Sequence, residues 1–466
     1  MTQATFAAIQ ARNRSFHDPH ERPSGGRLHR GLLAIIALGV SGAARADLPD
    51  PFNTTLYGTN FFNWIDFDAA DTAVSQPALA TTERPANTVI GYAGEQITHD
   101  DNVYHLPAPQ ITPVNSAQYS RADTIDTISV GADGRFGVSQ QYVEVLARLD
   151  DNLYFRNPHL DNIGESLQAL GNWAVGRRWS GQVGAGYDQW LGQFGNYVQF
   201  GPNFGLPKNI STTRKLLASS EFWLGYHWVI RANGLQRSTS YTENRFDIFT
   251  GDTASLGVEY YAAGGTVIGA SFTDTNGHYQ LPAVVNGISF DRNFQERTST
   301  VQFQTPIGTR LELHGDVGYV SHEYPAAPAY NFKGGTWDLA LSVQTSAKTQ
   351  LLLTGSRHLY EHIDADSEYY ESEQLRAIAR WAPTSKLTVD LSVWREKQDF
   401  IGPNPDSATL ILPKHNTLRY REASFAWSIS RALQVVISYN YDARESNVPQ
   451  LTYDENLVSA TLRGRF

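Results

Sequence analysis

The chain has 466 residues, no cysteine, and 47 acidic against 37 basic side chains. The lack of cysteine excludes a disulfide framework and a thiolate metal site, and the acidic balance argues against nucleic acid as a partner, because phosphate binding needs a basic surface. A mean hydropathy of −0.36 with 12% aromatic residues excludes a bundle of membrane helices but fits a transmembrane β-barrel, in which only every second strand residue faces lipid.

The first 46 residues have the features of an N-terminal extension followed by a Sec signal peptide. A basic stretch precedes the apolar run 31–40, and a small-x-small pattern of the kind that signal peptidase cuts ends at Ala46. The alternative is that the run forms a short buried helix. We predict cleavage before Asp47, which removes six arginines and two acidic residues and leaves a mature net charge of −14.

Residues 47–87 are polar, and we predict that they form a periplasmic N-terminal segment. From residue 88 to 466 the chain consists of alternating runs separated by turn residues. One run has the apolar residues Leu387, Val389, Leu391 and Val393, with Thr388, Asp390 and Ser392 between them. Because successive side chains of a strand point to opposite faces, this alternation predicts one face for hydrocarbon and one for water.

The connectors between these runs alternate in length. Short turns are expected near 133–135, 176–178, 226–227, 264–265, 306–308, 346–348, 383–385 and 430–432, and longer polar connectors lie between them. Short periplasmic turns and longer extracellular loops are typical of an outer-membrane barrel. We therefore predict an all-β, antiparallel, up-and-down transmembrane barrel over 88–466 with about 18 strands, 16 being the alternative. At this strand number side chains cannot fill the lumen.

The end of the chain carries a further indication of a barrel. Val458, Ala460 and Leu462 share one strand face with the terminal Phe466. A C-terminal aromatic residue on an alternating strand is typical of the signal that the barrel-assembly machinery reads. The alternative is that a phenylalanine stands at this position by chance, but chance does not explain the alternation that precedes it.

No trustworthy catalytic arrangement is present, so we predict neither an enzyme nor a cofactor or metal. The motifs of serine hydrolases, zinc proteases and nucleotide-binding loops are absent from the sequence. His358 and His362 could form a weak metal site on one strand face, but polar residues near a loop explain them better. A five-residue motif occurs twice, at 100–104 and at 150–154. One interpretation is a carboxylate cluster that binds Ca²⁺ or steers a polymer. The other, which we favour, is that Asp and Asn serve the turns at the strand ends.

Charged residues opposite the apolar faces are candidates for lining the lumen, where they would set selectivity. They are Glu312, His314, Asp316, Asp338, Arg376, Arg380, Asp390 and Glu396. The alternative is that a water-filled lumen merely tolerates them. Tyr369, Tyr370 and Trp394 could form a stacking path for sugar rings, although aromatic girdles at the membrane interfaces explain most such residues.

Several stretches resemble EpsL-type exopolysaccharide-biosynthesis outer-membrane proteins, which belong to a broader group of β-barrel porins. The resemblance begins with residues 94–107 and continues in 121–126, 151–154 and 170–173. Its motif residues are His99, Asp100, Asp101, Asn102, Tyr104, Asp151, Asn152, Tyr154 and Trp173. The resemblance implies a barrel that serves exopolysaccharide synthesis or export, and it implies no catalytic residue.

Three functional hypotheses follow. The first is a channel that passes an exopolysaccharide, with the polymer, its synthesis and export machinery and outer-membrane lipid as partners. The second is a general or solute-specific porin without a glycan role. The third, and weakest, is a surface enzyme or adhesin built on the barrel. All three place the mature chain in the outer membrane of a Gram-negative bacterium.

Overall fold

A computed structural model describes residues 87–107, 119–192, 194, 208–243, 248–285, 288–361, 369–401 and 414–466. All of them belong to one compact unit, Asp47–Phe466. The expected signal peptide, the cleavage position between Ala46 and Asp47 and the periplasmic segment before residue 87 lie outside the described residues. None of the helices in these ranges is long and apolar enough to span a membrane.

One antiparallel sheet of 18 strands makes up nearly all of the described chain. Its strands are β1 (Thr88–Asp100), β2 (Asp123–Val138), β3 (Gln141–Tyr154), β4 (Asn162–Val175), β5 (Trp179–Leu191), β6 (Ile210–Leu224), β7 (Trp228–Tyr241), β8 (Phe249–Tyr261), β9 (Val267–Tyr279), β12 (Phe294–Ile307), β13 (Leu311–Glu323), β14 (Phe332–Ser346), β15 (Thr349–Glu361), β16 (Tyr369–Thr384), β17 (Leu387–Ile401), β18 (His415–Ser428), β19 (Leu433–Ser446) and β20 (Tyr453–Arg465). The connectors add a small hairpin, β10 (Ala283–Val285) and β11 (Ile288–Phe290), and the short 3-10 helices η2 (Pro158–Leu160), η5 (Pro328–Tyr330) and η6 (Pro449–Leu451).

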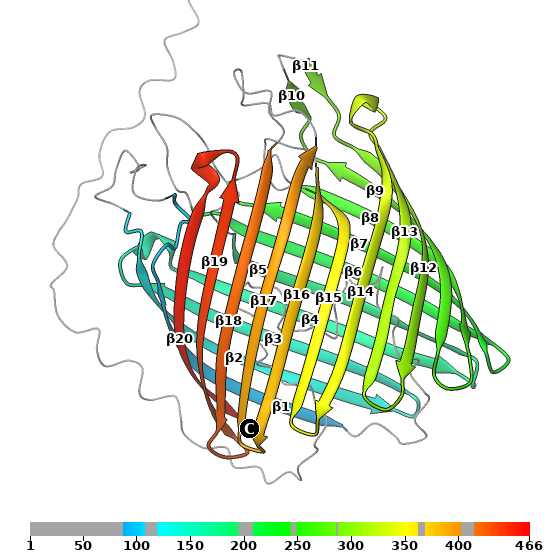
Figure 1. Cartoon of the computed structure of the whole chain (residues 1–466), viewed down its shortest axis with the longest axis horizontal. Helices are drawn as coiled ribbons and strands as arrows, with labels where there is room; N and C mark the ends of the chain where they lie inside the picture. Colours follow the sequence, from blue (N-terminus) through cyan, green and yellow to red (C-terminus); the bar gives the residue numbers. More distant parts are fainter. Residues whose placement is uncertain are drawn as a thin grey trace, which may run out of the picture. The chain divides into compact units, whose positions relative to one another are not determined.

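The sheet closes on itself (Figure 1). Each strand pairs with its neighbour in the chain, and β1 pairs with β20 from Tyr92 opposite Arg465 to Asp100 opposite Leu457. Phe466 extends this seam, because its N–H donates to the Gly91 carbonyl at 2.9 Å and its carbonyl accepts from the Gly91 N–H at 2.8 Å. The prediction of a closed up-and-down barrel with 18 strands is confirmed.

The two faces of the barrel wall differ as the alternation predicts. On the outer face the apolar side chains are solvent-accessible, for example Val317 at 54% and Ile437 at 51%. On the inner face the residues between them are mostly polar, and most are half-buried or buried; Asp316 and Ser438 are buried. An apolar exterior and a polar interior are the pattern of a barrel that sits in lipid.

The inner face also carries apolar clusters that the alternation does not predict. Leu146 and Leu170 pack together on the inner wall of β3 and β4. At the end with the longer connectors, Val103, Tyr104, Leu160 and Phe194 form a second cluster. Phe249, Phe294 and Tyr324 form a third at the same end. The second and third clusters hold connector residues against the strand ends.

Connector length alternates around the barrel, and in Figure 1 the strand ends that the long connectors join lie at one end, while the short turns and the C-terminus lie at the other. We call these the long-loop end and the short-turn end. One expected turn is misplaced: residues 133–135 lie inside β2, and the chain reverses after Val138 instead. Ser139 takes the left-handed conformation there (φ +62°). Asp-Gly is a common turn pair, but here the alternation continues through it and holds the pair in the strand.

Candidate functional site

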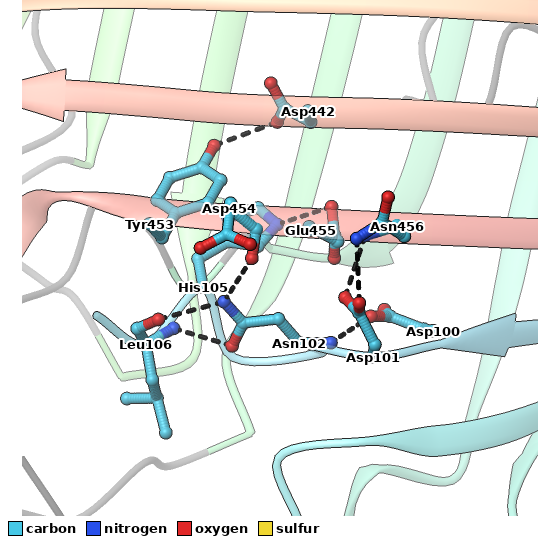
Figure 2. A network of polar contacts seen from close by, with 10 residues as sticks. All are labelled: Asp100, Asp101, Asn102, His105, Leu106, Asp442, Tyr453, Asp454, Glu455 and Asn456. Carbon is cyan, nitrogen blue, oxygen red and sulfur yellow. Dashed lines mark hydrogen bonds and ion pairs between the residues drawn. The ribbon is translucent and has the colours of Figure 1, made fainter. Parts of the chain in front are cut away.

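The residues after β1 fold over the strand end and fasten onto the last two strands, at the seam where the barrel closes (Figure 2). The Asn102 side chain is fully buried and donates hydrogen bonds to the main-chain oxygens of Leu106 at 2.9 Å and Asp454 at 2.8 Å. Asp101 accepts hydrogen bonds from the main-chain N–H and the side-chain amide of Asn456 at 2.7 and 2.8 Å. These contacts join residues more than 350 positions apart in the chain.

Three buried carboxyl groups lie in the same network: Asp100, Asp442 and Glu455. His105 forms an ion pair with Glu455 at 3.3 Å, and its ring stacks on Tyr453 with 4.3 Å between centroids. The Tyr453 hydroxyl in turn donates to Asp442 at 2.9 Å. We call these residues, with Asp101, Asn102, Asp454 and Asn456, the seam network (Figure 2).

The seam network contains the described group best placed to hold a metal ion. One ligand atom each from His105, Asp442 and Glu455 lies within 4.8 Å of the others. Each of these side chains also has interactions within the protein. Asp100 accepts a hydrogen bond from the Asn102 N–H at 2.7 Å, as a residue in a turn at a strand end does. The network therefore closes the seam through contacts within the protein.

The second copy of the repeat, 150–154, is built differently and lies two strands away. It stays within β3, where Asp150 accepts hydrogen bonds from Ser129 at 2.5 Å and Arg148 at 2.8 Å. Asn152 contacts the side chains of strands on both sides, while Asp151 is exposed on the outer face. The two copies therefore do not form one carboxylate cluster.

The remaining motif residues divide between the two faces. His99 and Trp173 point outward, and Trp173 packs edge-on against Trp179 at 5.2 Å, where an interfacial aromatic girdle is expected. Tyr104 is buried, and its hydroxyl lies 3.0 Å from Nε2 of His159 in the connector after β3. Burial lowers the pKa of the His159 imidazole, which suits it to accept the hydrogen bond from Tyr104. Tyr154 lies on the inner face of β3.

All eight lumen-lining candidates lie on the inner face of strands β13 to β17. Several are engaged with neighbours: Arg380 makes a bidentate pair with Asp390 at 2.7 and 3.1 Å. Glu312 accepts a hydrogen bond from Gln304 at 2.5 Å. Glu396 accepts from Ser372 at 2.8 Å and from Gln398 at 2.9 Å. The strand register places Asp316 directly opposite Asp338, and His314 lies two residues before Asp316.

A small cavity lies against this part of the wall, between β9 and β15. Its volume is about 80 Å³, and its lining residues are Thr273, Glu296, Thr298, Thr300, Asp316, Val320, Thr336, His358 and Leu359. His358 also approaches Asp338 at 3.8 Å. His362 lies outside the described residues, so neither interpretation of the two histidines is tested.

The strand register from β16 onward aligns a second set of inner-face polar and aromatic residues. Only some of them could be identified from the sequence. Arg376 lies opposite Trp394, Trp394 opposite Tyr420, and Tyr420 opposite Asp442. In the next row, Ser392 lies opposite Glu422, and Glu422 opposite Asn440. Directly opposed residues on one face are close neighbours, so these side chains form one surface, which we call the β16–β19 patch: Arg376, Ser392, Trp394, Tyr420, Glu422 and Asn440.

Within this patch the contacts are well defined. The Tyr420 hydroxyl donates to Asn440 at 2.7 Å, and the Trp394 ring meets the Tyr420 ring edge-on at 6.0 Å. The side-chain oxygen of Ser392 and the side-chain nitrogen of Asn440 are buried and have no hydrogen-bond partner within the described residues. Sequence alternation had indicated Arg376 and Trp394, but strand register was needed to find the other members.

A separate aromatic row runs along the inner wall at the long-loop end. Tyr370 lies between Tyr360 and Phe400, with ring centroids 5.6 and 5.1 Å away. The expected stacking path is therefore divided: Trp394 belongs to the patch with Tyr420, and Tyr370 to this row. The side chain of Tyr369 lies outside the described residues.

Residues 285–466 match the family model described as Putative beta-barrel porin 2. The match is to this porin group and does not single out its EpsL-type members. No curated protein matches the chain.

Among solved structures, the chain is similar to OccK2 (OpdF) of Pseudomonas aeruginosa in complex with glucuronate, at 11% identity and a TM-score of 0.44, covering 82% of this chain and 98% of that one. It is similar to a BenF-like porin from Pseudomonas fluorescens Pf-5 at 11% identity and a TM-score of 0.43, covering 81% and 98%. A third similar structure is OccK5 (OpdH) of Pseudomonas aeruginosa, at 11% identity and a TM-score of 0.43, covering 81% and 98%.

Proposed function

We propose that this chain is an outer-membrane channel that takes part in the export of an exopolysaccharide. The observation that carries the channel role is the closed barrel of 18 strands with an apolar exterior and a polar inner wall. A barrel of this strand number has a lumen wider than its side chains can fill. The porin-family match over residues 285–466 supports the same role.

The exopolysaccharide part of the proposal has two supports. The motif residues around 94–107 resemble those of EpsL-type proteins. The inner wall also displays carboxylate, amide and hydroxyl groups beside aromatic rings, a composition suited to sugars. Partners in this role are the polymer, the machinery that makes and exports it, and membrane lipid. The mature chain would reach the membrane after loss of residues 1–46.

A general or solute-specific porin without a glycan role is the second candidate, because the family match is to porins as a group. Two measurements separate the candidates. Purified protein in a planar lipid bilayer should conduct small ions under both. A deletion strain should accumulate polymer in the periplasm, with restoration on complementation, only under the export role.

Outer-membrane integrity in the deletion strain is the necessary control, because a leaky membrane would release polymer nonspecifically. Normal polymer secretion together with altered uptake of small solutes would replace the export proposal with the plain porin. The absence of ion conductance from correctly folded protein would contradict both candidates.

A further inference from the structure

We propose that the β16–β19 patch is a binding site for one neutral hexose unit of a passing saccharide, with the ring stacked on Trp394 and its hydroxyls bound by Ser392 and Glu422. This inference rests on the proposed channel function and specifies the class of ligand. Its members lie on the inner face of four adjacent strands, β16, β17, β18 and β19, in direct register.

The floor of the patch has hydrogen-bonding capacity that the described chain does not use. Ser392 is 5% exposed and Asn440 0% exposed, and neither the hydroxyl oxygen of the first nor the amide nitrogen of the second has a partner within the described residues. A buried polar group without a partner is unfavourable. An alcohol-rich ligand would give the Ser392 hydroxyl a partner, because each hydroxyl of a sugar can donate and accept a hydrogen bond.

The upper part of the patch remains accessible. Trp394, Glu422 and Arg376 are only half-buried, so they present surface toward the lumen. Ser392 and Trp394 are two residues apart on one strand, a separation of about 6.7 Å, and Glu422 lies opposite Ser392 on the next strand. A sugar ring stacked on the Trp394 indole would thus have its edge over Ser392 and the Glu422 carboxylate.

The charge balance favours a neutral sugar over an acidic one. Glu422 belongs to the patch, and Asp390, Glu396 and Asp442 lie beside it on the same face. Among the basic residues, Arg380 is already paired with Asp390, and the guanidinium of Arg444 lies over the Tyr453 ring, 4.8 Å from its centroid. Arg376 therefore faces an excess of carboxylates, and the carboxylate of a uronic acid would be repelled by them.

The test is block of ion current through single channels of the full-length mature protein in planar bilayers. The probes are maltohexaose, cellohexaose and mannohexaose as neutral sugars, and hexagalacturonate as an acidic one. At least one neutral hexasaccharide should block the wild-type channel at lower concentration than hexagalacturonate. Trp394→Ala should raise its half-blocking concentration about tenfold, and Ser392→Ala about fivefold.

Trp427→Ala is the matched control, because Trp427 lies on the outer face of β18 and is 48% exposed. It should leave the half-blocking concentration unchanged. Ser392→Ala removes no hydrogen bond of the described chain, so its barrel should fold as the wild type does. No block by any neutral sugar in a conducting wild-type channel, stronger block by hexagalacturonate, or equal block in Trp394→Ala would each overturn the binding site. A channel that does not conduct at all would instead contradict the proposed function.

Discussion

At the scale of single residues, Asn102 shows how much one side chain can hold together. Its amide and carbonyl bridge the connector after β1 to the start of β20 through three hydrogen bonds of 2.8 to 2.9 Å, and it is fully buried. No shorter side chain can reach both main-chain oxygens. One of these hydrogen bonds crosses to β20, as do the two that Asp101 makes with Asn456, and the other two Asn102 bonds hold the connector in shape.

We expect Asn102→Ala to lower the free energy of unfolding by about 2 kcal/mol, because the main-chain carbonyl groups of Leu106 and Asp454 would lose their donor. The measurement is urea unfolding of the barrel in lipid vesicles, followed by the shift of the folded band on unheated gels. Asp151→Ala, an exposed position in the other copy of the repeat, should change stability by less than about 0.5 kcal/mol. Equal losses in both variants would contradict the role given to Asn102.

At the scale of elements, several short turns depend on backbone conformation, because residues with positive φ occur in the turns after β2, β4, β6, β8 and β12. The turn between β8 and β9 contains Gly264 and Gly265, with φ values of +92° and +86°. A Cβ atom added at Gly264 would meet nothing within 4 Å. Any cost of a larger residue there arises from backbone strain alone, which residues with a Cβ atom incur in this region.

Gly264→Ala should therefore destabilise the barrel by about 1 kcal/mol. Gly234→Ala is the matched control. Gly234 lies within β7, is not among the glycines with positive φ, and a Cβ atom added there would meet only the main-chain oxygen of Thr253, at 4.0 Å. It should be neutral or stabilising by about 0.5 kcal/mol. The same unfolding assay in vesicles distinguishes them, and a larger loss at Gly234 than at Gly264 would refute the strain argument.

At the scale of the whole molecule, the barrel separates two environments across a wall one residue thick. Leu391 and Thr388 lie on the same strand, Leu391 outward with 50% exposure and Thr388 on the inner face. Only the outer position would place a charge in hydrocarbon. The consequences of the same substitution should thus differ by face.

We expect Leu391→Arg to destabilise the barrel in lipid by about 2 to 4 kcal/mol, the cost of a basic residue near the middle of the bilayer. Thr388→Arg should cost far less, because the inner face borders a polar lumen. Both are measured by reversible unfolding in vesicles. Similar costs at the two positions would show that the outer face does not contact lipid.

The C-terminal residue, Phe466, takes part in closing the barrel, and we also expect it to act as the assembly signal. Phe466 is 70% exposed on the outer face, while its main chain makes two hydrogen bonds with Gly91. Phe466→Ala retains both main-chain bonds, so purified protein should refold with a loss below about 1 kcal/mol. In cells we expect several-fold less assembled barrel, measured in outer-membrane fractions.

Deletion of Phe466 serves as the comparison, because it removes the two hydrogen bonds as well as the ring and should impair refolding too. Wild-type amounts of Phe466→Ala in the outer membrane would show that the aromatic ring is not the assembly signal.

The sequence by itself determined the fold class, the strand number and the alternation of short and long connectors. It could do so because a strand between lipid and water must alternate apolar and polar residues at a period of two. The same period placed all eight charged candidates on the inner face. The turn expected at 133–135 was misplaced because local turn chemistry was weighed above the alternation that continues through it.

Only the tertiary structure decided which inner-face residues meet. Asp100 reaches Glu455, and Glu422 lies between Ser392 and Asn440, because strand register and closure of the sheet bring them together. Periodicity assigns a residue to a face, but it carries no information on its height relative to the next strand. The two copies of the repeat illustrate the difference, since nearly identical residues form a seam network at 100–104 and ordinary strand contacts at 150–154.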